Sequence, residues 1–71
     1  MFPVATPGEM IRRVRAEFLE MPGLKLTVAQ AQRLWGADRP TCEAVIEALT
    51  QARFLARTPD GAVVLRAAMS A

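Results

Sequence analysis

The chain of 71 residues lacks histidine and tyrosine and has a single cysteine, Cys42. One cysteine excludes an intramolecular disulfide, and without histidine the chain has too few soft ligands for a zinc site. No activated nucleophile, metal-binding cluster or glycine-rich phosphate loop is recognisable, so the sequence predicts no enzymatic activity and no cofactor. We expect Cys42 to act as a small buried apolar residue.

Long apolar runs are also missing. No stretch approaches the ~20 residues that a membrane-spanning helix requires. The first ten residues, MFPVATPGEM, have no charged region followed by a long apolar segment, so no signal peptide is expected. With only one cysteine in addition, the sequence predicts a cytoplasmic protein that does not enter a membrane.

Charge of one sign is only mildly in excess, at nine Lys and Arg against seven Asp and Glu. The distribution says more than the sum, because residues 26–52 carry two basic and three acidic residues whereas residues 53–71 carry three basic and one acidic. A composition that is 52% hydrophobic and 23% charged is typical of a globular chain. At this length we expect one domain with a small core.

Two segments carry helix signals with an N-cap and an apolar stripe. The first helix is predicted from Thr6 to about Glu20, with Pro7 at its first position and a stripe of Met10, Ile11, Val14 and Phe18. In the second, Thr27 and Gln30 form a capping box, and the helix ends near Trp35 with Gly36 as its stop. Its predicted apolar face consists of Val28, Ala31, Leu34 and Trp35.

A third helix and three strands complete the pattern. Asp38 is the expected cap of a helix that runs to about Ala52 and turns Cys42, Val45, Ile46 and Leu49 inward. Residues 24–26, 54–58 and 62–66 read as strands, and Asp60-Gly61 between apolar runs is a strong hairpin signal. Because an isolated hairpin is barely stable in water, we expect it to pack on the helices and pair with the strand at residues 24–26.

This order of elements predicts an α+β fold: a small winged helix-turn-helix of three helices, with a C-terminal β-hairpin wing and a short strand between the first two helices. The expected organisation is an N-terminal arm over residues 1–5, the winged helix domain over residues 6–66 and a flexible tail over residues 67–71.

The segment LTVAQAQRLWGADRPTCEAVIEALTQARFLART resembles the core of bacterial winged helix-turn-helix transcription regulators. The resemblance covers roughly residues 24–66 and includes Leu26-Thr27 at the second helix, Gly36 in the turn and Arg39-Pro40-Thr41 at the recognition helix. One departure is Arg53, which stands before Phe54 where these families commonly have glycine. A left-handed backbone at Arg53 would have a conformational cost that glycine avoids.

The resemblance implies a small DNA-binding protein, a transcription regulator or accessory factor, that inserts its third helix in the major groove and lays its wing on the backbone. Two-fold dimers suit paired half-sites, so a homodimer on double-stranded DNA is expected. The candidate DNA-binding residues lie at the start of the second helix, at the start of the third helix and beside the hairpin: Thr27, Gln30, Arg39, Thr41, Arg57 and Arg66.

The outward face of the third helix argues the other way. A helical wheel places Pro40, Glu43, Ala44, Glu47 and Gln51 there, which gives two carboxylates and no base to face a polyanion. The alternative is therefore a winged helix that binds proteins or dimerises without binding DNA. Apolar residues with no evident core position, which are Leu19, Phe2 and Val4, are the candidates for that contact.

Overall fold

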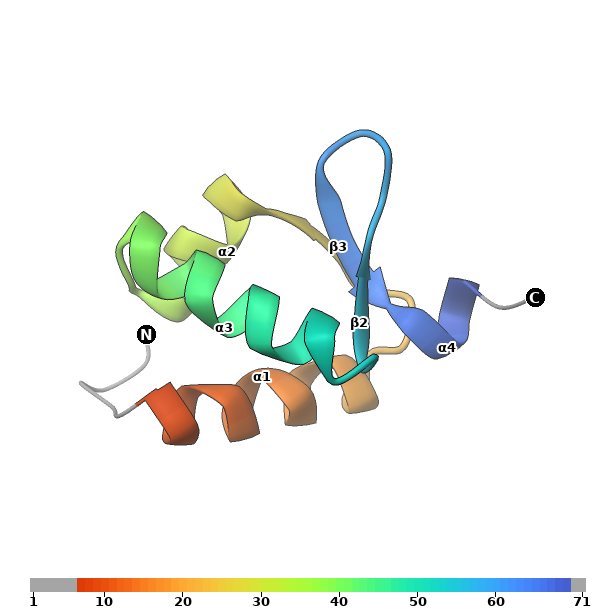
Figure 1. Cartoon of the computed structure of the whole chain (residues 1–71), viewed down its shortest axis with the longest axis horizontal. Helices are drawn as coiled ribbons and strands as arrows, with labels where there is room; N and C mark the ends of the chain where they lie inside the picture. The colour runs from red at the N-terminus through yellow and green to blue at the C-terminus, as the bar shows by residue number, and fades with distance from the viewer. Residues whose placement is uncertain (1–6, 70–71) are drawn as a thin grey trace.

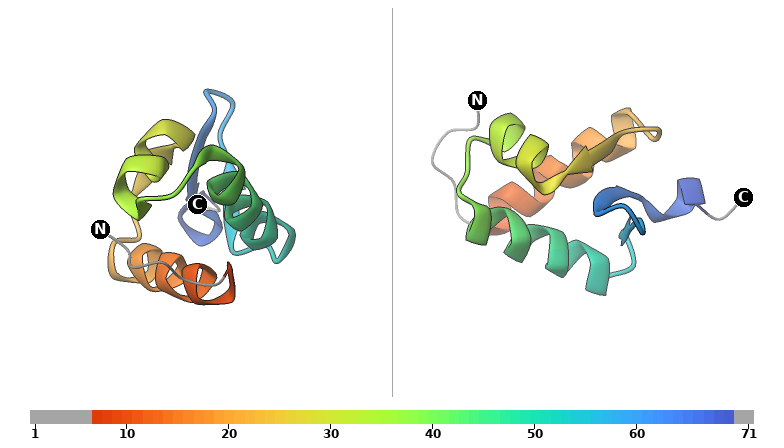
Figure 2. Two further views of the ribbon diagram at one scale, coloured as in Figure 1. Left: turned by 90° about the vertical axis from the view of Figure 1, so that its left-hand side faces the viewer. Right: turned by 90° about the horizontal axis from the view of Figure 1, so that it is seen from above.

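The computed structural model describes residues 7–69, which form an α+β fold of four helices and one three-stranded antiparallel sheet. Along the chain the elements are α1 (Pro7–Glu20), β1 (Lys25–Thr27), α2 (Val28–Trp35), α3 (Arg39–Gln51), β2 (Leu55–Arg57), β3 (Ala62–Leu65) and α4 (Arg66–Met69). Helix α1 covers one side of the molecule, and the turn of the β2–β3 hairpin points away from it, while the base of the hairpin lies near the end of α1 (Figures 1 and 2).

The sheet joins distant parts of the sequence in the order β1-β3-β2. Strand β1 pairs with β3 so that Leu26 lies opposite Val63, and β2 pairs with β3 so that Leu55 lies opposite Leu65. The predicted pairing of the short strand with the hairpin is confirmed, although β1 begins one residue later than expected and both hairpin strands are shorter. Gly61 takes a left-handed backbone with φ of 85° at the hairpin turn, which explains the glycine there.

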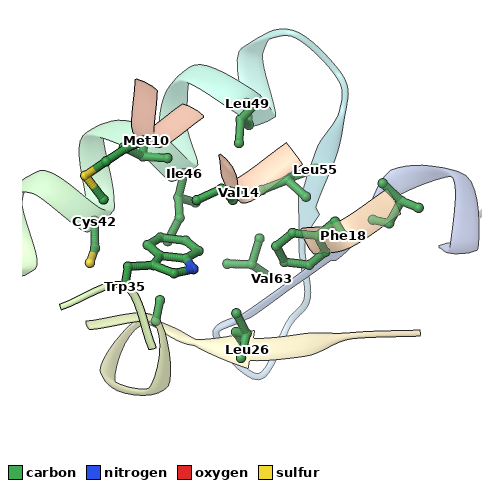
Figure 3. Close-up of a cluster of buried hydrophobic side chains, with 13 residues drawn as sticks. Met10, Val14, Phe18, Leu26, Trp35, Cys42, Ile46, Leu49, Leu55 and Val63 are labelled. Atoms are coloured by element: carbon green, nitrogen blue, oxygen red, sulfur yellow. The ribbon is translucent and has the colours of Figure 1, made fainter. Parts of the chain in front are cut away.

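The core fills the space between α1, α3 and the inner face of the sheet (Figure 3). The predicted stripe of α1 is confirmed at Met10, Val14 and Phe18, which are buried, with Ile11 packed at the edge. The remaining buried apolar residues come from every other element before α4: Leu26, Ala31, Trp35, Cys42, Val45, Ile46, Leu49, Leu55, Ala62, Val63 and Leu65.

Two core residues, Trp35 and Cys42, carry a polar or titratable group. Trp35 is buried, and its Nε1 donates a hydrogen bond to Glu17 Oε1 at 3.1 Å, which ties α2 to α1. Cys42 is buried as expected, and burial raises the pKa of its thiol. The thiol is therefore protonated at neutral pH and unreactive.

Three expectations need correction or cannot be compared. Leu34 does not belong to the apolar face of α2, because it is 43% exposed: that face is already filled by Ala31 and Trp35, one turn and one residue away. Residues 66–69 form the helical turn α4 where a flexible tail was expected from residue 67, since Ala-Ala-Met favours helix and Arg66 N donates to Phe54 O at 3.0 Å. The cap residue Thr6 and the arm residues Phe2 and Val4 lie outside the described residues.

Candidate nucleic-acid interface

The start of α2 is held by the predicted capping box. Gln30 N donates to Thr27 Oγ1 at 3.1 Å, and Thr27 N donates to Gln30 Oε1 at 2.9 Å. Both side chains use acceptor oxygens in these bonds. The Thr27 hydroxyl hydrogen and the Gln30 Nε2 amino group remain as donors, which is the chemistry that a phosphate oxygen requires.

The hairpin lies directly beside this helix start. Thr27 is opposite Ala62 in the sheet, and Thr58 N donates to Ala62 O at 2.9 Å on the other side. Lys25 Nζ pairs with Asp60 Oδ2 at 3.0 Å and so fastens the hairpin turn to β1. A hydrogen bond from Thr58, followed by that from Lys25, holds the pKa of Asp60 below its usual range. The hairpin turn is thus fixed, but its tip carries a carboxylate.

Arg57 and Arg66 are not brought together. Arg57 is exposed at the end of β2 nearest the hairpin turn, opposite Val63, and its side chain makes no ion pair within residues 7–69. Arg66 is exposed at the other end of the hairpin, where it begins α4. Of the two, Arg57 is therefore the one that shares the hairpin's free end with Thr27.

The start of α3 is occupied by its own contacts. Asp38 Oδ1 accepts a hydrogen bond from Thr41 N at 2.9 Å, and the hydrogen bonds from Thr41 hold the pKa of Asp38 below its usual range. Arg39 Nε pairs with Glu43 Oε2 at 3.0 Å, one turn further along the helix. Thr41 is half-buried. Arg39 and Thr41 are thus present where the sequence predicts them, but Arg39 is partly neutralised by Glu43.

The exposed face of α3 is acidic, as the helical wheel predicts. Pro40, Ala44 and Glu47 are exposed, Glu43 is half-buried, and Gln51 is exposed and donates from Nε2 to Glu47 Oε1 at 3.3 Å. Any phosphate contact at this face must therefore come from its flanks, at the start of α2 and on the hairpin.

A second feature lies on the side of α3 that faces α1, and it was not predicted from the sequence. An open groove of about 400 Å³ runs between α1 and the end of α3, and we name it the α1–α3 groove. Its apolar lining consists of Ile11, Ala48, Leu49, Ala52 and Phe54. Two arginines, Arg15 and Arg53, complete the lining. The unusual arginine before Phe54 was the only sequence signal for this groove.

No family model, curated protein or solved structure matches this chain. The resemblance to winged helix-turn-helix regulators therefore stays a prediction that rests on the residues quoted for it. Within residues 7–69, no helix combines the length and the hydropathy needed to cross a membrane.

Proposed function

We propose that this chain is a winged-helix DNA-binding protein, a small transcription regulator or accessory factor, in which α3 is the recognition helix and the β2–β3 hairpin is the wing. The observation that carries the proposal is the junction of β1, α2 and the hairpin. It sets the remaining donors of Thr27 and Gln30 beside the turn end of the hairpin, where Arg57 closes β2.

The proposed DNA face suits a duplex because the start of α2 and the hairpin, which flank α3, differ in chemistry from the exposed face of α3 between them. The flanks offer hydrogen-bond donors and a cation for phosphates, at Thr27, Gln30 and Arg57. The centre offers carboxylates, at Glu43 and Glu47, which accept hydrogen bonds from cytosine amino groups and are repelled by phosphates. The expected result is modest affinity that depends on salt, with any sequence preference read by α3.

The acidic face of α3 also favours a second candidate function, a winged helix that binds a protein. Leu19 and Met21 are 58% and 55% exposed on the α1 side, and large apolar side chains at that exposure are common components of protein contacts. This candidate differs from the first in needing no salt-dependent affinity for DNA.

Binding to random-sequence duplex DNA over a salt series, with light scattering on the same sample, separates the two. A DNA-binding winged helix gives measurable affinity at low salt with a steep negative salt slope. Arg57→Ala should lower both affinity and slope, because it removes a phosphate contact from every sequence. The matched control is Arg12→Ala, an exposed arginine on α1, which contributes none of the proposed contacts.

Charge reversal tests the orientation of α3. Glu47→Lys replaces a repelled group by an attracted one and should raise affinity for random DNA several-fold if α3 faces the duplex. An unchanged affinity would place α3 away from DNA. No binding by the parent protein at low salt, with a dimer or larger species in scattering, would overturn the DNA proposal in favour of the protein-binding candidate.

A further inference from the structure

The α1–α3 groove lies apart from the proposed DNA face and has a distinct character. Its floor is apolar, with Ile11 on α1, Leu49 near the end of α3 and Phe54 after the helix. Its volume of about 400 Å³ falls in the range of small-molecule sites, which is about 300–1,000 Å³. The two helices that form its walls lie side by side in Figure 1.

The charge of the groove is uniformly positive. Arg15 enters from α1, and its guanidinium lies over the Phe54 ring at 5.1 Å from the centroid. Arg53 enters from the turn after α3, and no acidic residue is among the lining residues. Within residues 7–69, neither arginine forms an ion pair, whereas Lys25 and Arg39 each have a carboxylate partner. The groove therefore offers two guanidinium groups to an anion.

Arg53 has a backbone conformation that is unfavourable for a residue with a side chain. It has φ of 62°, a left-handed conformation that favours glycine, and it is the only non-glycine residue with positive φ in the described chain. The turn is fixed by hydrogen bonds from Arg53 N to Thr50 O at 3.0 Å and from Phe54 N to Leu49 O at 2.9 Å. Glycine would make the same turn with less strain, but it would not put a cation at the groove.

We propose that the α1–α3 groove binds a small organic carboxylate. The carboxylate lies between Arg15 and Arg53, and its alkyl or aryl part covers the apolar floor at Ile11, Leu49 and Phe54. Guanidinium groups bind carboxylates through charge-assisted, often bidentate, hydrogen bonds, while the apolar floor selects acids that carry a hydrophobic group. This inference does not depend on DNA binding, because the groove and the proposed DNA face use different residues.

Titration of the ¹⁵N-labelled protein with octanoate, followed by amide NMR shifts at neutral pH, tests the proposal. The probe set is octanoate and its neutral amide, octanamide, which share the alkyl chain and differ in charge. Saturable shifts are expected at Ala48, Ala52, Arg53 and Phe54 with octanoate, and octanamide should bind at least about fivefold more weakly. Equal binding of the two probes, or no saturation by octanoate below about 10 mM, would overturn the proposal.

The variants separate the site from the fold. Arg53→Gly should weaken octanoate binding about three- to fivefold while raising the thermal midpoint, since it removes both a cation and a strained backbone. Arg15→Gln, on an ordinary helical backbone, should weaken binding by a similar factor. Arg33→Gln carries the same change of charge outside the groove and should leave binding unchanged. An equal loss in Arg33→Gln would reduce the effect to net charge and contradict the assignment.

Discussion

Helices α2 and α3 are each followed by a residue with a left-handed φ, but Gly36 follows α2 directly, whereas Arg53 comes after Ala52, the right-handed cap of α3. Gly36 after α2 has φ of 63°, and Arg53 after α3 has φ of 62°. At Gly36 the residue is the one that the left-handed conformation favours, and its amide donates to Gln32 O. At Arg53 it is not. The end of α2 therefore has the residue type that a left-handed φ favours. The end of α3 does not, and its arginine lines a groove that contains a second arginine, Arg15.

The aromatic residues beside these two positions, Trp35 before Gly36 and Phe54 after Arg53, differ in how deeply they are buried. Trp35 precedes Gly36 and is 1% exposed, with its indole inside the cluster of buried core side chains (Figure 3). Phe54 follows Arg53 and is only half-buried, with one face covered by Arg15. The end of α2 is thus anchored in the core, whereas the end of α3 lies at the surface, where a side chain can meet a ligand.

The largest effect is expected from removing the two aromatic side chains at these helix ends. Trp35→Ala should cost about 3–5 kcal/mol of unfolding free energy, which in so small a domain leaves little folded protein. Phe54→Ala should cost less, about 1–2 kcal/mol, because its ring is only partly buried at the edge of the core. Urea denaturation followed by circular dichroism measures both. Equal costs would contradict the difference between the two helix ends.

The next largest effect is expected from replacing Gly36, the glycine that follows α2. Gly36→Ala should destabilise the protein by about 1–2 kcal/mol, because a Cβ in the left-handed region meets the neighbouring carbonyl. Thermal unfolding by calorimetry gives the value. An unchanged stability would mean that α2 can end in another conformation, and the comparison with Arg53 would fail.

The reverse substitution should have the opposite sign. Arg53→Gly is expected to stabilise the protein by about 0.5–1 kcal/mol, since the relieved strain outweighs the added freedom of glycine in the unfolded chain. Urea denaturation of the variant and its parent measures the change. A destabilised Arg53→Gly protein would show that the arginine contributes to the fold itself, and the strain would need no functional reason.

The smallest effect concerns the other end of α3, which titrates. Hydrogen bonds from Thr41 lower the folded pKa of Asp38 below the ordinary value of about 3.9. A depressed carboxyl pKa adds stability that is present above about pH 4 and is lost as pH falls through the folded pKa. Asp38→Asn keeps a capping side chain but cannot titrate, so its stability should match the parent at low pH more closely than at neutral pH. Denaturant midpoints between neutral and acidic pH measure this, and parallel curves would contradict it.

Much of the fold can be read from the sequence because local signals agree with one another. The capping box at Thr27 and Gln30, the cap at Asp38 and the turn at Asp60-Gly61 each need only a few neighbouring residues, and all three are confirmed. Leu34 was misassigned because periodicity alone cannot tell which side of a short helix meets a neighbour. The helical turn after β3 was missed because it has no cap and depends on a contact with Phe54.

The candidate sites were less predictable because they depend on what lies opposite. The sequence indicates the acidic face of α3, which follows from helical spacing within one segment. It does not reveal that Glu43 pairs with Arg39, because side-chain pairing depends on rotamers that helical spacing does not fix. The separation of Arg57 and Arg66 along the hairpin does follow from the predicted strands and turn. The α1–α3 groove is lined by residues almost forty positions apart, from Arg15 to Arg53, so only the fold brings these two arginines to one groove.

Amide NMR shifts on addition of a random-sequence duplex at low salt test most directly whether the proposed DNA face binds DNA and is separate from the α1–α3 groove. We expect shifts at the start of α2 around Thr27 and Gln30, along the exposed face of α3 and near Arg57, with Ala52 to Phe54 little changed. Shifts centred on Arg15, Arg53 and Phe54 would make the groove the phosphate site and contradict the account.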